Sequence, residues 1–150
     1  MPDGIQVYTN ARYHWSIAYP ANWGLEVNNE EFIRIVAPEK NGVCGVRSRP
    51  TSQATADALA DYAMNYARKN LKERKGLEQV TVSRESIRLR GDIPATEVVV
   101  AIKPGGGQAR RIYTVVSGNG FMVDCAASDA AWPSNDTQFK RIMASFTPSR

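Results

Sequence analysis

The feature that most constrains the fold is an aromatic stretch over residues 13–23. Its first large side chains occupy alternate positions: Tyr13, Trp15, Ile17 and Tyr19. A strand places alternate side chains on one face, so this period of two predicts a strand over about residues 13–19 with an apolar face. Pro20 cannot donate to a sheet and favours an extended residue before it, so the strand is expected to end there. Trp23 is expected to fold back onto the same surface, and we interpret the stretch as the seed of the core.

Alternating hydrophobicity predicts further strands, separated by Pro, Gly and Asn turn signals. Their expected ranges are 24–27, 32–36, 43–49, 80–89, 96–102, 111–116 and 121–126, after a weak edge segment within residues 1–10. The apolar parity changes across residues 83–86, which predicts a bulge in that strand. Residues 96–102 are apolar on both faces, which predicts a central strand.

Two segments show the helical period instead. Thr55 is a plausible N-cap and Gly76 a plausible C′ residue, so a long helix is predicted over about residues 55–75. Its expected apolar face is formed by Leu59, Tyr62, Ala63, Tyr66, Ala67, Asn70 and Leu71. A second helix is predicted over residues 134–146, with Ser134 or Asn135 as its cap.

The order of these elements is strands, a long helix, four strands in hairpin succession and a final helix. Strands in meander order predict an antiparallel sheet whose faces the helices cover. The fold class is therefore α+β. The 150 residues fit a single domain over residues 1–150, since no internal repeat or linker interrupts them.

Charge and hydropathy exclude some classes of protein. No apolar run approaches the roughly 20 residues that span a bilayer, and residues 1–4 carry no feature of a leader peptide. The net charge is +4, and the basic residues are dispersed apart from a patch over residues 68–75. We interpret that patch as a solvated helix end and expect no nucleic acid as a partner.

The reactive residue types do not combine into a site. His14 is the only histidine, and a nucleophile pair would need it beside Cys44 or Cys125 with an orienting carboxylate such as Asp124. Neither cysteine stands in a motif for an activated thiolate, and zinc would need more ligands at sensible spacing. We therefore predict that the chain is not an enzyme and has no catalytic residue, no cofactor-binding residue and no metal-binding residue.

Two further patterns have simpler interpretations. Residues 105–107 are three glycines, but they precede a strand and lack the Lys-Ser/Thr ending of a phosphate-binding loop, so we expect a hairpin tip. The acidic residues of the helical region do not pair as catalytic carboxylates do. They are Asp57, Asp61, Glu73 and Glu78. We expect Asp57 and Asp61 to lie on the solvated side of the helix.

Several motifs together resemble the PsbP-like family, whose fold is shared with Ran-binding nuclear import factors. They are the Tyr-Pro-x-x-Trp opening at residues 19–23, the Gly-x-x-Pro-Ala turn at 91–95, the segment 120–127 and the Ser-Phe ending at 145–146. The similarity spans about residues 13–147.

The resemblance implies an α/β/α sandwich around a central antiparallel sheet. It also implies a bacterial secreted protein, periplasmic or extracellular, or a lipoprotein anchored through a removed leader. The function that it implies is a non-catalytic binding or assembly module of the cell envelope, with a protein or a small ligand as partner. The alternative is a small-ligand-binding protein or an enzyme on a cone-shaped α+β fold.

The two cysteines are expected to be close in space. Cys44 shares a face with Val46, and Cys125 shares a face with Phe121 and Val123, so both should point inward. Maturation outside the cytosol, which only the resemblance implies, would favour a disulfide between them. Two separate buried thiols remain the alternative.

Overall fold

The computed structural model describes residues 4–149, which contain two α-helices and ten strands. The first part consists of β1 (Ile5–Asn10), β2 (Trp15–Pro20), β3 (Gly24–Asn29), β4 (Phe32–Val36), a 3₁₀ turn (Pro38–Lys40) and β5 (Val43–Pro50). The rest consists of α1 (Ala56–Lys75), β6 (Glu78–Leu89), β7 (Ile93–Lys103), β8 (Gln108–Val116), β9 (Asn119–Ala127), α2 (Trp132–Ala144) and β10 (Thr147–Pro148). The predicted α+β class is confirmed; the first three residues of the expected N-terminal edge segment lie outside the described range.

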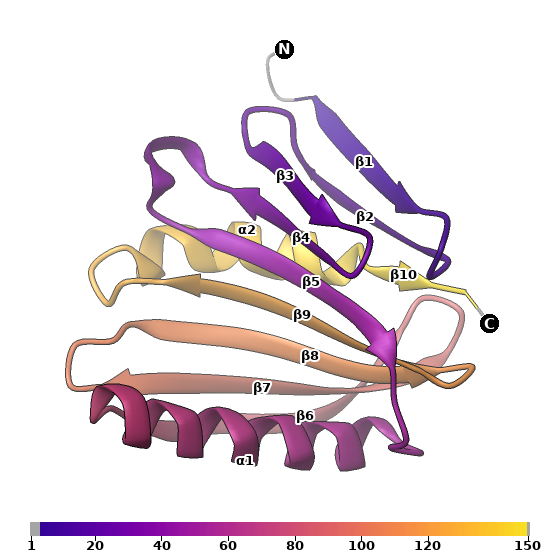
Figure 1. Cartoon of the computed structure of the whole chain (residues 1–150). Helices are drawn as coiled ribbons and strands as arrows, with labels where there is room; N and C mark the ends of the chain where they lie inside the picture. Colours follow the sequence, from indigo (N-terminus) through magenta and orange to yellow (C-terminus); the bar gives the residue numbers. More distant parts are fainter. Residues whose placement is uncertain (1–3, 150) are drawn as a thin grey trace.

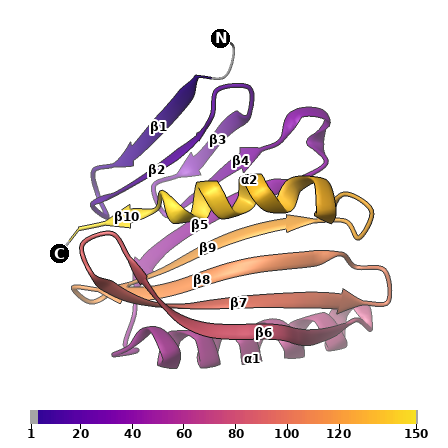
Figure 2. The same ribbon diagram turned by 180° about the vertical axis from the view of Figure 1, so that it is seen from behind.

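Seven strands form one antiparallel sheet in the order β3-β4-β5-β9-β8-β7-β6. The pairing of β5 with β9 joins the hairpins before α1 to those after it. α1 packs on β6, β7 and β8, whereas α2 packs on β8, β9 and β2. Figures 1 and 2 look at opposite sides of the sheet, and each shows one helix in front of it. The two helices therefore cover opposite faces, as predicted.

The strand expected to be central, β7, is instead next to the edge strand β6. Both of its faces are nevertheless buried. Val98 and Val100 belong to the apolar cluster under α1, and Ala95 and Val99 belong to the larger cluster on the other face. Apolar side chains on both faces thus report coverage by two layers, and they do not report the position of a strand within its sheet.

The aromatic stretch is part of the core, as predicted. Its alternating large side chains are buried, and so is Trp23. Its strand β2 does not belong to the seven-stranded sheet, because it forms a second sheet with β1 and β10. The Trp15 ring lies 5.6 Å from that of Phe146, and its Nε1 donates a 2.8 Å hydrogen bond to Ser48 Oγ on β5. The small sheet is therefore fastened to the large one through its aromatic face.

The strand β2 begins two residues later than predicted. Residues 11–14 form a turn after β1, in which the Tyr13 amide donates to Asn10 Oδ1 at 2.9 Å. His14 has a φ of 59° and is exposed at the end of this turn. The prediction that His14 lies within the strand is thus wrong, because the hairpin needs a left-handed residue there.

The final helix α2 starts at Trp132, two residues before the predicted start. Pro133 stands in its first turn, where a missing amide hydrogen costs nothing. Asn135 is a buried residue in the first turn of α2, and its side-chain amide donates hydrogen bonds to the carbonyl oxygens of Ala131 and Asn41. The prediction of Ser134 or Asn135 as the cap is therefore wrong: Asn135 ties the helix to the loop before β5.

The boundaries of the long helix α1 agree with the predicted ones. Thr55 Oγ1 accepts a hydrogen bond from the amide of Ala58, and Gly76 closes the helix with a φ of 64°. The predicted buried face is only partly right. Leu59 and Ala63 are partly buried against the apolar cluster under α1, but Tyr62 and Tyr66 are exposed. The fully buried residues of the helix are Ala60 and Met64. Their small and flexible side chains let the helix approach the sheet closely. The helix is consequently rotated so that its tyrosines leave the core.

The bulge predicted in the strand after α1 is present in β6, where the register with β7 shifts between Thr81 and Ser83. This strand also changes the interpretation of Asp57 and Asp61. Arg84 on β6 lies 3.3 Å from Asp57 Oδ1 and 2.7 Å from Asp61 Oδ1. The two carboxylates are exposed, but they tie the first half of α1 to the edge strand.

Candidate functional site

A groove lies between α1 and the neighbouring strands β5, β8 and β9, with a cavity volume of about 710 Å³. It exists because α1 packs on one half of the sheet only. The same face of β3, β4 and β5 has no helix in front of it (Figure 1). The side of α1 that faces this uncovered half therefore forms one wall of the groove, and β5 forms the other. We call it the arginine–tyrosine groove after Arg47, Arg49, Tyr62 and Tyr66, which line it.

The strand wall of the groove carries positive charge. Arg47 and Arg49 alternate on β5 with the buried residues Val46 and Ser48, so both arginines project from the uncovered face and are exposed. The Arg47 guanidinium lies 4.2 Å from the centre of the Phe32 ring. The ring itself lies close against Gly45, where an added Cβ would stand 3.1 Å from it. This glycine and this ring therefore hold Arg47 in place at the groove.

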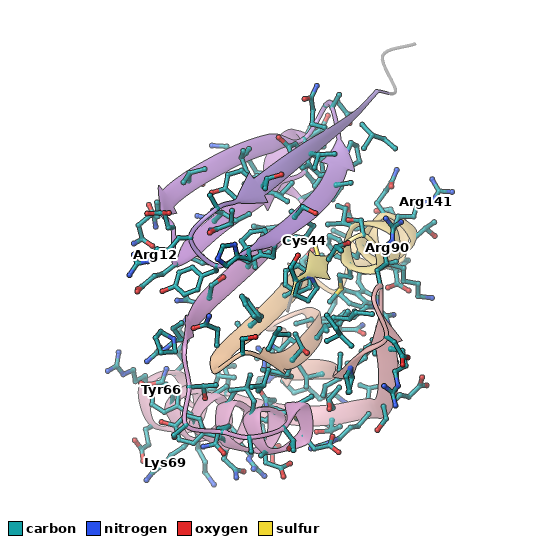
Figure 3. The ribbon with its side chains drawn as sticks, turned by 90° about the vertical axis from the view of Figure 1, so that its right-hand side faces the viewer. Arg12, Cys44, Tyr66, Lys69, Arg90 and Arg141 are labelled. Atoms are coloured by element: carbon teal, nitrogen blue, oxygen red, sulfur yellow. A yellow bond between two sulfur atoms is a disulfide. The ribbon has the colours of Figure 1, made fainter. Side chains whose placement is uncertain are left out.

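The helix wall is aromatic. Tyr62 and Tyr66 are one turn apart on α1, and 62% and 67% of their surfaces are exposed. In Figure 3, Tyr66 lies above Lys69, which is on the side of α1 away from the sheet. Large aromatic rings with this exposure are unusual on a helix that also has a buried face, since burial of the rings would stabilise the fold.

The floor of the groove contains Arg111, which belongs to a partly buried charged cluster. Arg111 on β8 stands opposite Asp124 on β9, with 3.7 Å between Nε and Oδ2, and its Nη1 donates to Gln79 Oε1 at 3.1 Å. Asp124 Oδ1 is buried and has no hydrogen-bond partner among residues 4–149. Burial raises the pKa of Asp124, and the nearby guanidinium groups of Arg111 and Arg47 oppose that rise. Burial likewise raises the pKa of Tyr113 beside it.

These groups suit the recognition of a binding partner. Guanidinium groups and tyrosine rings bind anionic and aromatic or aliphatic groups, but they supply no nucleophile with an adjacent base. Within residues 4–149, no group of three or more His, Cys, Asp or Glu side chains could hold a metal ion. No helix in the same range is both long and apolar enough to cross a membrane.

The residues singled out in the sequence lie elsewhere. Cys44 and Cys125 are opposite each other on β5 and β9, with Cα atoms 4.0 Å apart and their sulfur atoms bonded. They are fully buried on the α2 side of the sheet, away from the groove. His14 is exposed in the turn before β2. The three glycines form the β7–β8 hairpin tip, where the Gly106 amide donates to Ile102 O.

A second ion cluster lies on the α2 side of the sheet. Arg110 on β8 is within 3.3 Å of Glu97 Oε1 on β7 and 2.9 Å of Asp136 Oδ1 on α2. Lys140, one turn further along α2, also contacts Asp136. Because every charge in this cluster has an opposite partner, the cluster joins α2 to the sheet.

The groove residues were missed at the level of the sequence. Tyr62 and Tyr66 have helical spacing with Leu59 and Ala63, so the sequence predicts that they belong to the core. One available signal was the alternation on β5, in which two arginines share a face opposite Cys44 and Val46. A strand with one buried face and two arginines on the other is a candidate binding surface when a helix stands beside it.

Comparison with known proteins identifies structures with a similar fold. The sequence matches no protein-family model and no curated protein. The structure is similar to the solution structure of a cyanobacterial PsbP, CyanoP from Synechocystis sp. PCC 6803, with a TM-score of 0.77 and 14% identity over 98% of this chain and 94% of that chain.

Two crystal structures show the same likeness more weakly. One is PA94, a protein of unknown function from Pseudomonas aeruginosa, with a TM-score of 0.60 and 14% identity over 97% of this chain and 98% of that chain. The other, from Bacteroides thetaiotaomicron VPI-5482, has a TM-score of 0.50 and 13% identity over 100% of this chain and 50% of that chain. At these identities the comparisons show the fold alone, and that fold is PsbP-like.

Proposed function

We propose that the chain is a single PsbP-like domain over residues 1–150 and acts as a non-catalytic binding or assembly module of the bacterial cell envelope. The observation that carries this proposal is the arginine–tyrosine groove. Its walls are exposed, and its guanidinium groups and tyrosine rings can bind a partner but supply no nucleophile with an adjacent base. The likeness to CyanoP supports a PsbP-like module. The pairing of Cys44 with Cys125 supports an oxidising compartment, since disulfides persist there.

A protein partner fits the groove better than a small ligand. The arginine and tyrosine side chains of both walls are solvent-exposed and would leave much of a small molecule in water, whereas small-ligand sites usually enclose most of their ligand. Tyrosine and arginine are also the residues that contribute most often to the affinity of protein interfaces. The module would thus contact its partner through one wall from α1 and one wall from β5.

Site-specific photo-crosslinking in the native host tests this proposal. A benzophenone amino acid replaces Tyr66 in the groove, and in a matched variant it replaces Arg141, which lies on the opposite side of the molecule (Figure 3). We expect a discrete crosslinked species from position 66 only, located in the envelope fraction. Crosslinks of equal yield from both positions, or a protein confined to the cytosol, would contradict the proposal.

A further inference from the structure

We propose that the arginine–tyrosine groove binds an extended acidic segment of a partner protein, with carboxylates at alternate positions contacting Arg47 and Arg49. The inference rests on the proposed function and names the chemistry of the partner at the same site. Three properties of the groove support it: two arginines without a direct ion pair, its dimensions and its composition.

Arg47 and Arg49 of the groove form no direct ion pair among residues 4–149, although Arg47 interacts electrostatically with Asp124. Other arginines of the sheet have carboxylate partners: Arg34 pairs with Glu26, Arg84 with Asp57 and Asp61, and Arg110 with Glu97 and Asp136. Among residues 4–149, neither Arg47 nor Arg49 has a carboxylate within ion-pair distance. Arg47 is held instead by the Phe32 ring, which positions the guanidinium without neutralising it.

The spacing of these charges matches an extended chain. Arg47 and Arg49 are two residues apart on a strand, so their side chains emerge about 7 Å from each other. The alternate side chains of an extended peptide repeat at the same distance. The helix wall from Leu59 to Asn70 is about 17 Å long at 1.5 Å per residue, which accommodates about five residues of such a peptide.

The composition of the groove favours a peptide over other anions. Two unpaired guanidinium groups are few for a polynucleotide, whose binding sites follow many phosphates. Arg111 is already paired with Asp124 at the floor, and that carboxylate would repel a phosphate placed there. A second copy of this chain is also disfavoured, because each copy carries a net charge of +4. Tyr62 and Tyr66 would cover the backbone and the apolar positions of the bound segment.

A fluorescein-labelled decapeptide of alternating glutamate and threonine, followed by fluorescence anisotropy, tests the inference. We expect wild-type protein to bind it and an Arg47→Glu/Arg49→Glu variant to bind about tenfold more weakly. The matched control is Arg90→Glu/Arg141→Glu, which changes the net charge equally on the opposite side of the molecule (Figure 3). We expect this control to weaken binding by less than about twofold, and salt to weaken wild-type binding.

Arg49→Glu alone provides a second variant, because Arg47 acts on the pKa of Asp124 and its reversal could disturb the floor of the groove. We expect this single variant to keep the wild-type melting temperature and to bind more weakly than wild type. Equal weakening in the groove and control variants would overturn the inference. So would wild-type protein that binds oligothymidylate or phosphatidylglycerol vesicles through Arg47 and Arg49 but does not bind the acidic peptide.

The two proposals can fail separately. If the crosslink from position 66 forms and the acidic peptide neither binds nor competes with it, the binding module stands and the acidic partner is wrong. If the peptide binds through Arg47 and Arg49 but no crosslink forms in the envelope, the recognition chemistry stands and the proposed location or assembly role is wrong. If neither is observed, both proposals are wrong.

Discussion

The two faces of the seven-stranded sheet are built from different side chains. On the α2 face, Trp15, Phe121, Phe139 and Phe146 pack together around the Cys44–Cys125 pair with almost no exposed surface. On the α1 face, the apolar cluster is smaller, and the Arg111–Asp124 pair lies on the same face at the floor of the groove. The buried residues of this apolar cluster are Ala60, Met64, Val98, Val100, Ala109 and Tyr113. One face is a large aromatic core, and the other has a small core next to a charged groove.

This difference indicates how the fold separates stability from recognition. The strand β5 shows both within four residues, since Val46 and Ser48 are buried on the α2 face while Arg47 and Arg49 are exposed in the groove. Side chains of a strand alternate, so one backbone can hold the core with one set and present a binding surface with the other. Substitutions should therefore affect stability on one face and binding on the other.

The largest effect is expected from the cysteine pair. Replacing Cys44 and Cys125 with alanine should lower the free energy of unfolding by about 4.5 kcal/mol, because the bridge spans a sequence separation of 81 residues and constrains the unfolded chain. Urea denaturation of the oxidised protein and the double variant measures this. Binding of the acidic peptide should stay unchanged below the melting temperature.

The state of these cysteines in the cell needs its own measurement. Intact mass of protein from its native compartment, under denaturing and non-reducing conditions, should show no thiol that can be alkylated. Two alkylatable thiols would contradict the disulfide. If the intact mass shows the bond but the double variant loses less than about 1 kcal/mol in the free energy of unfolding, the bond adds little to stability.

A pair of aromatic truncations compares the two faces directly. Phe146 is fully buried between Trp15 and Phe121, so Phe146→Ala should cost about 4 kcal/mol. Tyr66→Ala removes a ring of which 67% is exposed, and should change stability by less than about 0.5 kcal/mol. Urea denaturation measures both. The comparison breaks if Tyr66→Ala destabilises as much as Phe146→Ala, because Tyr66 would then belong to the core.

Much of the fold follows from local patterns in the sequence. The period of two in strands such as 32–36 and 121–126, the Thr55 cap and the Gly76 terminus all act within a few residues, so they can be recognised without knowing the rest of the chain. The pairing of β10 with β2 was not predicted, since it joins residues 16 and 147 and depends on where α2 ends.

The groove could not be predicted for a related reason. Its tyrosines satisfy the spacing of a buried helical face, and only the approach of Ala60 and Met64 to the sheet decides that α1 is rotated away from them. The uncovered half of the sheet is a consequence of tertiary packing, namely that α1 contacts β6, β7 and β8. Local hydrophobicity indicates that β7 is covered on both faces, but it does not indicate how α1 is rotated over the strands that it covers.

The smallest expected effects are on the pH dependence of stability, where Asp57 and Asp124 should act in opposite directions. Asp57 accepts hydrogen bonds from Thr96 Oγ1 at 2.7 Å and from Arg84, and these lower its pKa below the ordinary 3.8. Its stabilising contribution is therefore present above about pH 4 and is lost as the pH falls through the lower folded-state pKa. Asp57→Asn should lower the melting temperature at pH 7, and this deficit should shrink as the pH falls below about 4, as thermal unfolding across the pH range would show.

Asp124 should show the opposite dependence, because burial raises its folded-state pKa above the ordinary 3.8. The folded state then binds the proton more tightly than the unfolded state, so the contribution of Asp124 to stability falls as the pH rises from about 4 through the raised pKa. The melting temperature of Asp124→Asn relative to wild type should accordingly increase between pH 4 and pH 7, whereas that of Asp57→Asn should decrease as the pH rises toward about 4 and change little above it. Thermal unfolding of the three proteins in the same buffers measures both trends. If the Asp124→Asn difference fell with rising pH, the pairing with Arg111 would outweigh the burial, and the floor of the groove would be a stabilising ion pair like the one that joins Arg110 to α2.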